Sequence, residues 1–204
     1  MIPKKILAQY GAKEYFFRKG QVLFQEGTEA LYYYQVEQGS VKMITSSASG
    51  QEFIQGIFKA GESFGEPPLF GGFSYPSSAL AMEDSMVLKL EKTEFFNLLK
   101  ENFDIHLQLD RVLCMRLKYK SMVLSDISFY DPEQRVMNLL QYLKKNSDAI
   151  KMVGPGRHQR PYLVPYTRQQ LADMSGMRVE TVIRTVKKMQ HQGKLEIVGR
   201  KIAI

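Results

Sequence analysis

Residues 167 to 204, TRQQLADMSGMRVETVIRTVKKMQHQGKLEIVGRKIAI, constrain the fold more than any other stretch of the chain. Thr167 and Gln170 form a Thr-x-x-Gln capping box, which predicts the start of a short helix. A tight turn follows at Gly176, and apolar residues then recur at helical spacing until Gly193 ends a second helix. Two short helices joined by a glycine-containing turn predict a helix-turn-helix, whose second helix enters the major groove of DNA. The apolar positions predicted to face the core are Val179, Val182, Ile183, Val186 and Met189.

The exposed face of the predicted second helix is mostly charged. It carries Arg178, Glu180, Thr181, Arg184, Lys187 and Lys188. Glu180 and Arg184 lie four residues apart, so both can approach base edges together. Arginine recognises guanine O6 and N7, and glutamate accepts from the cytosine amino group. Taken alone, the pair better suits a helix-stabilising surface ion pair. The preceding turn, the basic residues and the alternating segment 194 to 204, which suits a small β wing, favour base reading.

The positive charge of the chain is concentrated in its last third. The composition, 44% hydrophobic and 24% charged with a net charge of +7, is that of a globular protein of one or two domains. Up to Asp126 there are 14 Lys and Arg against 15 Asp and Glu, a balance of −1; from Ile127 onward the counts are 14 against 6, a balance of +8. A basic segment that also contains a helix-turn-helix pattern is suited to neutralising DNA phosphates.

The single cysteine, Cys114, limits the chemistry of the chain. One cysteine allows no internal disulfide and no cysteine-ligated zinc or iron–sulfur cluster within the chain, and we expect it to be an ordinary buried thiol. No apolar run is long enough to span a bilayer, and the amino terminus lacks a signal-like apolar core. The sequence therefore predicts cytoplasmic residence and no membrane partner.

Residues 14 to 90 have the pattern of an all-β unit. Short strand-like runs are separated by glycines at regular intervals, which predicts an antiparallel sandwich or barrel. Residues 60 to 90 interrupt this pattern with several glycines and prolines before strand character returns at 85 to 90. Such an irregular segment either surrounds a binding site or forms a long loop.

From Lys92 the hydrophobic period becomes helical, so the fold class is α+β. A short helix begins at Thr93, and a longer one is predicted from about 103 to 126. Apolar residues along it follow a 4-3-4-3 spacing, which is typical of a two-stranded coiled coil and predicts a homodimer; the alternative is packing against the chain's own barrel. The predicted dimer seam consists of Leu113, Leu117, Lys120, Leu124 and Ile127.

A further helix should run from Asp131-Pro132 to about Lys145, with the aspartate as its cap. Residues 127 to 130 are then a candidate hinge between two domains, 1–126 and 127–204. Residues 146 to 165 are predicted to form a loop that can hold a hairpin.

Two blocks of this sequence stand out together. They are the glycine-spaced β segment that ends in Phe64-Gly65-Glu66, and the pair Thr167-Arg168-Gln169-Gln170 and Val179-Glu180-Thr181-Val182-Ile183-Arg184. With them, nearly the entire chain resembles the Crp/Fnr family of bacterial transcription regulators. The resemblance implies a cyclic-nucleotide-binding-type jelly-roll barrel, a long dimerisation helix and a winged helix-turn-helix domain. It also implies double-stranded DNA with palindromic TGA-type half-sites, and RNA polymerase, as partners.

Several site residues follow from the resemblance. Thr167, Arg168 and Gln169 look like phosphate contacts, and Glu180 and Arg184 look like the base readers. Val179 stands where the cyclic-AMP receptor branch has an arginine, so the chain is closer to the Fnr branch there. Arg178 stands where a small capping residue is usual, and it can contact a phosphate instead.

The effector site departs from the family pattern. In cyclic-AMP binders a Gly-Glu pair holds the ribose and an Arg-Ser or Arg-Thr pair holds the phosphate; here Gly65-Glu66 is present, but the later pair reads Pro76-Ser77. Without that guanidinium the phosphate loses a bidentate partner, and Pro67 and Pro68 remove two N–H donors nearby. Lys120-Ser121 falls where the adenine contacts of the family originate. The candidate effector residues are Gly65, Glu66, Ser77, Lys120 and Ser121.

An effector other than cyclic AMP is therefore expected, and its identity stays open. One alternative is a cyclic-nucleotide-dependent regulator that uses Glu66, Ser77 and Lys120. Haem usually takes an axial histidine or cysteine, and His106, His158 and His191 all lie outside the barrel segment. Another apolar or anionic small molecule, or no ligand, is also compatible with the sequence.

Two other classes of function are alternatives to a transcription regulator. Cupin-type enzymes hold a metal between histidines and a carboxylate, but no histidine occurs between Met1 and Ile105. An interaction module whose basic tail binds an acidic protein would lack salt-dependent DNA affinity. We expect a regulator and not an enzyme, in which an effector changes the register of the dimer helices and so the spacing of the two reading helices.

Overall fold

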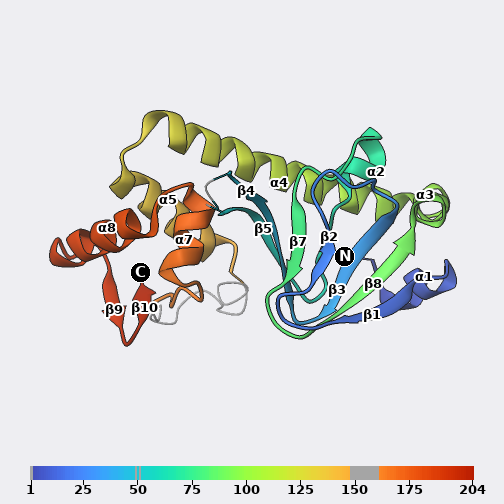
Figure 1. The fold of residues 1–204 in the computed structure, drawn as a ribbon, viewed down its shortest axis with the longest axis horizontal. Helices are drawn as coiled ribbons and strands as arrows, with labels where there is room; N and C mark the ends of the chain where they lie inside the picture. Colours follow the sequence, from blue (N-terminus) through green and yellow to red (C-terminus); the bar gives the residue numbers. More distant parts are fainter. Residues whose placement is uncertain (1, 49, 51, 148–160) are drawn as a thin grey trace. The chain divides into compact units, whose positions relative to one another are not determined.

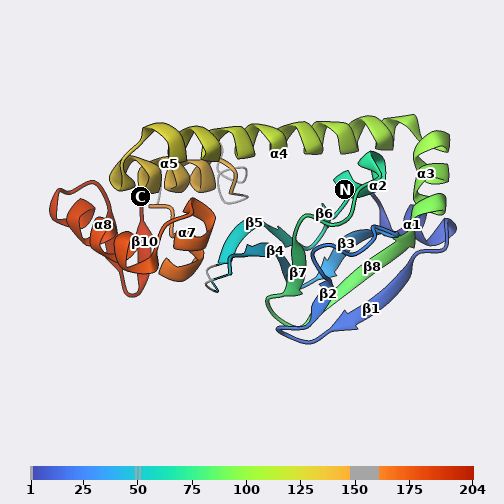
Figure 2. The same ribbon diagram turned by 45° about the horizontal axis from the view of Figure 1, so that its top comes forward.

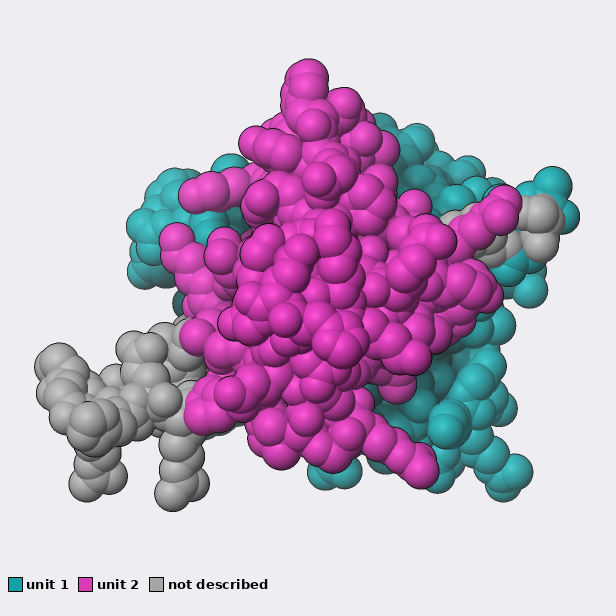
Figure 3. Space-filling view, turned by 90° about the vertical axis from the view of Figure 1, so that its left-hand side faces the viewer, with its two compact units in different colours: residues 1–117 teal, residues 118–204 magenta. Residues whose placement is uncertain are grey.

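The computed structural model describes residues 2–48, 50, 52–147 and 161–204. Its contacts divide the chain into two compact units, Met1–Leu117 and Lys118–Ile204, shown in two colours in Figure 3. The predicted domain boundary near residue 126 stays a prediction.

The first unit is an eight-stranded antiparallel barrel with helices at its ends (Figure 1). One sheet has the strand order β1-β8-β3-β6 and the other β2-β7-β4-β5. Two four-stranded antiparallel sheets with crossed-over connections match the predicted jelly roll. The strands are β1 Lys13–Phe17, β2 Val22–Phe24, β3 Tyr32–Gln38, β4 Ser40–Ser46, β5 Glu52–Lys59, β6 Ser63–Phe64, β7 Ser78–Ala81 and β8 Ser85–Glu91. The helices are α1 Lys4–Gln9, α2 Pro67–Gly71, α3 Lys92–Glu101 and the first part of α4 Phe103–Phe129.

Aromatic side chains fill the space between the two sheets. Phe24 of one sheet lies 5.3 Å from Tyr34 and 6.1 Å from Phe64 of the other, measured between ring centroids. Because side chains alternate along a strand, Tyr33 points to the opposite face of its sheet from Tyr34. There it stacks on Phe95 of α3 at 4.6 Å, so the same strand builds both the barrel interior and the seat of α3.

The irregular segment 60 to 90 contains more structure than the sequence indicated. The two prolines 67 and 68 occupy the first turn of α2, where a missing N–H costs nothing, and Gly72 ends this helix with φ 67°. Strand β7 pairs with both β2 and β4, but sequence reasoning missed it. Its residues, Ser-Ala-Leu-Ala, are small and lack the β-branched and aromatic side chains that mark a strand.

Helix α4 runs unbroken to Phe129, beyond the predicted end near 126 (Figure 2). Leu117 and Leu124 are 68% and 67% exposed, and Ile127 is also exposed, whereas Leu113 packs against the barrel core. The expectation for Cys114 was wrong, because this thiol is exposed. No helix within the described ranges is long and apolar enough to cross a membrane.

Within its described residues, the second unit contains the end of α4, three further helices and a small hairpin. They are α5 Pro132–Lys145, α7 Arg168–Ser175, α8 Val179–His191, β9 Glu196–Val198 and β10 Lys201–Ala203. Asp131 caps α5 as predicted, accepting from the Gln134 amide at 2.9 Å. Strands β9 and β10 form the predicted wing, and Leu163 forms a β-bridge with Ala203. The hairpin considered within 146 to 165 lies mostly outside the described residues.

Helix α8 buries one face, as its spacing predicted, with one exception. Val182, Val186 and Met189 are buried against the rest of the unit, while Val179 is half-buried. Ile183 was wrongly placed on this face: its side chain is 40% exposed. Ile183 directly precedes Arg184, so it lies at the border between the buried and the exposed face.

We predict that Gly39→Ala lowers the melting temperature of the protein much more than Gly27→Ala. Both glycines have φ above +80°, so both substitutions introduce the strain of a left-handed residue, about 1–2 kcal/mol. A Cβ at Gly39 would also lie 2.7 Å from the Asp84 carbonyl and 2.9 Å from Ser85 Cα, whereas one at Gly27 meets nothing within 4 Å. Thermal unfolding followed by circular dichroism checks this; equal losses would contradict the close packing of the β3–β4 turn against Asp84 and Ser85.

Candidate nucleic-acid interface and effector site

The start of the helix-turn-helix has the predicted capping geometry. Thr167 Oγ1 accepts from the Gln170 amide at 3.1 Å, and Gln170 Oε1 accepts from the Thr167 amide at 2.8 Å. Gly176 ends α7 with φ 64°, a left-handed conformation that glycine adopts without steric cost. Arg178 precedes α8 without capping it through its side chain, as its residue type predicted. These local interactions fix where the exposed face of α8 begins.

The two predicted base readers share the exposed face of α8. Glu180 and Arg184 are both exposed, and their i,i+4 spacing places them on neighbouring turns of one side. Lys187 is exposed one turn further along, and Thr181 is half-buried beside Arg184. The arrangement presents a carboxylate and a guanidinium together, the two groups that read a C·G pair by its edges. Their contacts with bases stay a prediction.

The amino end of α7 is partly engaged within the protein. Thr167 and Gln169 are exposed, and Gln169 Nε2 donates to Asp173 Oδ1 at 2.7 Å. Arg168 is half-buried and donates to the Arg200 carbonyl in the turn of the wing at 3.2 Å. Burial lowers the pKa of Arg168 from its ordinary value. Arg168 therefore ties α7 to the wing, in addition to its predicted role at a phosphate.

Sequence reasoning missed an acidic residue next to the reading face. Glu133, in the first turn of α5, forms ion pairs with Lys194 and with Lys188, the latter at 2.9 Å. The hydrogen bonds from Lys194 and Lys188 hold the pKa of the Glu133 carboxyl below its ordinary value. The same carboxylate raises the pKa of Lys188. Lys188, predicted to be a DNA-binding residue, thus has a partner within the protein.

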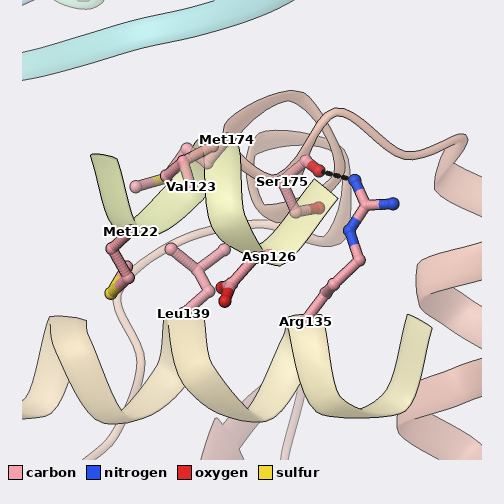
Figure 4. A pocket seen from close by; sticks show the side chains of 7 residues that line it. All are labelled: Met122, Val123, Asp126, Arg135, Leu139, Met174 and Ser175. Carbon is pink, nitrogen blue, oxygen red and sulfur yellow. Dashed lines mark hydrogen bonds between the residues drawn. The ribbon is translucent and has the colours of Figure 1, made fainter. Parts of the chain in front are cut away.

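A small cavity marks where the end of α4 meets α5 and α7 (Figure 4). Its lining is Met122, Val123, Asp126, Arg135, Leu139, Met174 and Ser175. The buried Asp126 accepts from Asn138 of α5 at 2.8 Å, and Arg135 of α5 donates to the backbone carbonyl of Ser175. Among the described residues, Arg135 Nε has no hydrogen-bond partner. Polar contacts therefore connect the last turns of α4 to the turn of the helix-turn-helix through α5.

The barrel holds a buried ion pair. Glu66 is completely buried, and Arg116 of α4 donates to its two carboxylate oxygens at 3.2 and 3.0 Å. Arg116 also donates to the Ser63 carbonyl at 2.6 Å, and the Ser63 hydroxyl donates to Glu66. The guanidinium lies 4.9 Å from the centre of the Phe58 ring, a cation–π distance. The carboxylate predicted to meet an effector is thus already neutralised by the chain itself.

Sequence reasoning missed Arg116, although one signal could have found it. Arg116 continues the barrel-facing stripe of α4, in which Leu109, Val112 and Leu113 precede it at helical spacing. An arginine in the buried stripe of a helix needs a carboxylate partner. The sequence cannot say which one, because Glu66 lies 50 residues away.

The remaining candidate effector residues are not all brought together. Gly65 has φ 77°, and a Cβ there would lie 3.3 Å from the Phe24 and Tyr75 rings. Ser77 is buried, and its hydroxyl has no hydrogen-bond partner among the described residues. Lys120 and Ser121 are exposed on α4 in the second unit, so their grouping with Glu66 and Ser77 stays a prediction.

The surroundings of Gly65 are aromatic. Phe24 stacks on Tyr75 with ring centroids 3.8 Å apart, and burial raises the pKa of Tyr75 to about 12. Burial and the nearby Glu66 carboxylate likewise raise the pKa of Tyr33. At neutral pH both phenols are therefore protonated. In the part of the chain that the structure describes, no three His, Cys, Asp or Glu side chains gather as metal ligands.

Comparison with known proteins assigns a family description to each unit. A cyclic nucleotide-binding domain matches residues 14–102, and a Crp-like helix-turn-helix domain matches residues 134–204. The fumarate and nitrate reduction regulatory protein of Escherichia coli K12 is 27% identical over 187 residues, which cover 92% of this chain and 72% of that protein. The same protein of Salmonella typhi matches equally.

Two solved structures share the fold. A c-di-GMP-responsive global regulator from Xanthomonas campestris superposes with a TM-score of 0.79, at 22% identity over 98% of this chain and 96% of that one. A variant of CooA from Carboxydothermus hydrogenoformans superposes with a TM-score of 0.78, at 22% identity over 100% and 87%.

We predict that Arg116→Met destabilises the barrel by about 3 kcal/mol, because it leaves the Glu66 carboxylate buried without a counter-charge. Breaking a fully buried pair costs about 3–5 kcal/mol; the Arg116 side chain is 26% exposed, which favours the lower figure. Arg111→Met, at an exposed arginine of the same helix, is the matched control. Urea unfolding measures both. The double variant Glu66→Gln/Arg116→Met should recover most of the loss, and a single variant as stable as the parent would disprove the role of the pair.

Proposed function

Since this chain belongs to the Crp/Fnr family of transcription regulators, we propose that it binds a palindrome of TGA-type half-sites as a homodimer and inserts one α8 into each half-site. The chain is a DNA-binding transcription regulator and not an enzyme. The finer statements, which concern the site, the dimer and the effector, rest on the geometry of the two units.

The face of α8 carries the proposal for base reading. Glu180 and Arg184 are exposed together in the first two turns, immediately after a turn held by a capping box and a left-handed glycine. The amino-terminal turns of a recognition helix are those that reach base edges. Thr167, Gln169 and Arg178 flank them, with Lys187 one turn beyond, and these residues supply contacts to phosphates. Phosphate contacts set the register in which the two readers meet the bases.

Exposed leucines on α4 support the homodimer. Leu117, Leu124 and Ile127 are apolar, exposed and spaced as a coiled-coil seam, and the resemblance places a dimer helix here. Burying one such side chain fully contributes about 1.5–3 kcal/mol, so two copies of the seam supply a substantial driving force. Lys120 also lies in the seam, where its ammonium can stay in solvent while its stem packs.

Inside the barrel, we propose an effector other than cyclic AMP, or none. Arg116 already forms an ion pair with the Glu66 carboxylate. Pro76 stands where cyclic-AMP binders place the arginine that binds the phosphate. Among the described side chains, Ser77 has the one buried hydroxyl without a hydrogen-bond partner. We propose that Ser77 and Gly65 remain available to contact a ligand. Bound cyclic AMP, detected by mass spectrometry of the purified protein, would overturn this reading.

The joint after α4 is our proposed transmission element. Helix α4 continues through residues 127 to 129, so the break before α5 is confined to Tyr130 and Asp131. The contacts of Asp126 with Asn138, and of Arg135 with Ser175, connect both sides of this break. If the register of the two dimer helices changed, these contacts would pass the movement to the turn before α8. RNA polymerase, implied by the family, is the proposed downstream partner.

We predict that Arg184→Ala weakens binding to the preferred palindrome by about 1–3 kcal/mol and relaxes discrimination at one base pair of each half-site. The reason is the loss of the bidentate contact to guanine. Selection from random duplexes, performed in parallel with the parent and the variant, measures the change. Ile183→Ala, at the exposed neighbour on the same helix, is the control and should return the parental site. An identical palindrome from Arg184→Ala and the parent would show that Arg184 is not a base reader.

We also predict that Leu124→Lys converts the dimer to a monomer at micromolar concentration, because it removes an apolar contact and adds a second pair of like charges to a seam that already contains Lys120. Met115→Lys introduces the same charge at an exposed position of α4 outside the seam and should leave the dimer intact. Sedimentation equilibrium distinguishes the two outcomes. Persistence of the Leu124→Lys dimer, or dissociation of both variants, would contradict the proposed seam.

A further inference from the structure

Glu133 joins two lysines that come from different parts of the DNA-binding unit. Lys188 lies in the last turn of α8, and Lys194 lies in the turn before β9. One oxygen of the carboxylate pairs with each: Oε2 with Lys188 at 2.9 Å and Oε1 with Lys194. Both lysines are about half or more exposed, whereas the Glu133 side chain is only 19% exposed. The largely buried carboxylate therefore forms ion pairs with two lysines that lie at the surface.

This cluster lies beside the reading face and not behind it. A groove runs between α8 and the start of α5, and its residues are Asp131, Pro132, Glu133, Thr181, Arg184, Thr185 and Lys188. Thr181, Arg184 and Lys188 form one stripe along α8, and Arg184 is the proposed base reader. The acidic start of α5 forms the opposite wall. A duplex that meets Arg184 would approach this groove, whose other wall carries Glu133.

Stability alone does not explain this arrangement. Exposed ion pairs contribute little to folding, and a carboxylate next to a polyanion opposes its approach. Each lysine that neutralises a phosphate adds affinity that is independent of sequence. Two paired lysines are thus withheld from such contacts, in a domain with an otherwise large excess of positive charge.

We propose that Glu133 is a specificity-determining residue: it withholds Lys188 and Lys194 from the DNA backbone, lowers sequence-independent affinity, and leaves recognition to the base contacts of α8. This inference rests on the proposed reading of DNA by α8. On random duplex, where phosphate contacts supply essentially all the affinity, removal of the carboxylate frees both lysines. On the palindrome the base contacts fix the register, so only a lysine that reaches a phosphate in that register contributes.

The test measures the affinity of the parent protein and of the Glu133→Gln variant for a random-sequence duplex. Fluorescence anisotropy gives this affinity at salt concentrations between about 50 and 200 mM. Each released lysine steepens the slope of log affinity against log salt by about 0.9. The fourfold rise in salt should therefore cost the variant about 3- to 12-fold more affinity than the parent. The ratio of affinities for palindrome and random duplex should fall. Glu196→Gln, an equal charge change at an exposed position of the wing, is the control and should leave the slope closer to that of the parent.

Lysine substitutions separate the effect from a change in folding. In the parent, where Glu133 already pairs with this lysine, Lys188→Met should leave the salt slope nearly unchanged. In the Glu133→Gln background the same substitution should make the slope shallower by about 0.9. If Lys188→Met alone makes the salt slope of the parent shallower by about 0.9, the proposal is overturned, whether or not Glu133→Gln folds.

Three further results are decisive. An unchanged or shallower slope for folded Glu133→Gln overturns the inference, as does equal steepening in Glu196→Gln. In both cases the parent still binds the palindrome, so the proposed function stands. A parent protein that binds no duplex at any salt concentration removes the proposed function itself, and this inference with it.

Discussion

The pair of Arg116 and Glu66 is the interaction on which the barrel and its outgoing helix depend. A completely buried carboxylate is costly unless a cation meets it, and the cation comes from α4. The first part of α4 is thereby fixed on the barrel through side-chain bonds as well as apolar packing. Glu66, which the resemblance assigned to an effector, thus has a structural partner within the barrel.

The features that could be predicted from the sequence are those set by local interactions. The capping box, the left-handed glycine of the turn, the face of α8, the cap of α5 and the wing all involve residues within a few positions of one another. Most strands of the barrel, but not β6 or β7, were indicated by strand-like runs between regularly spaced glycines. Strand β7 was missed because its small residues carry no β signal, and Ile183 because periodicity alone does not define the edge of a buried face.

The features that escaped prediction are partnerships across long separations. Arg116 meets Glu66 from 50 residues away, and Lys194 meets Glu133 from 61. The sequence can mark a single residue, such as Arg116 in the buried stripe of α4, but only the fold selects its partner. These two pairs nevertheless set the local charge at one site in each of the two units. One neutralises the site expected to receive a signal, and the other reduces the positive charge beside the helix expected to read DNA.

In the proposed dimer, the two α8 helices read half-sites one helical turn apart. The most direct test is its affinity for the selected palindrome compared with the same duplex after insertion of about five base pairs between the half-sites. The insertion rotates one half-site to the opposite face of the duplex and leaves every base contact within a half-site intact. We predict a loss of about 100-fold or more, towards the level of non-specific binding. Equal affinity for the two duplexes would contradict the account.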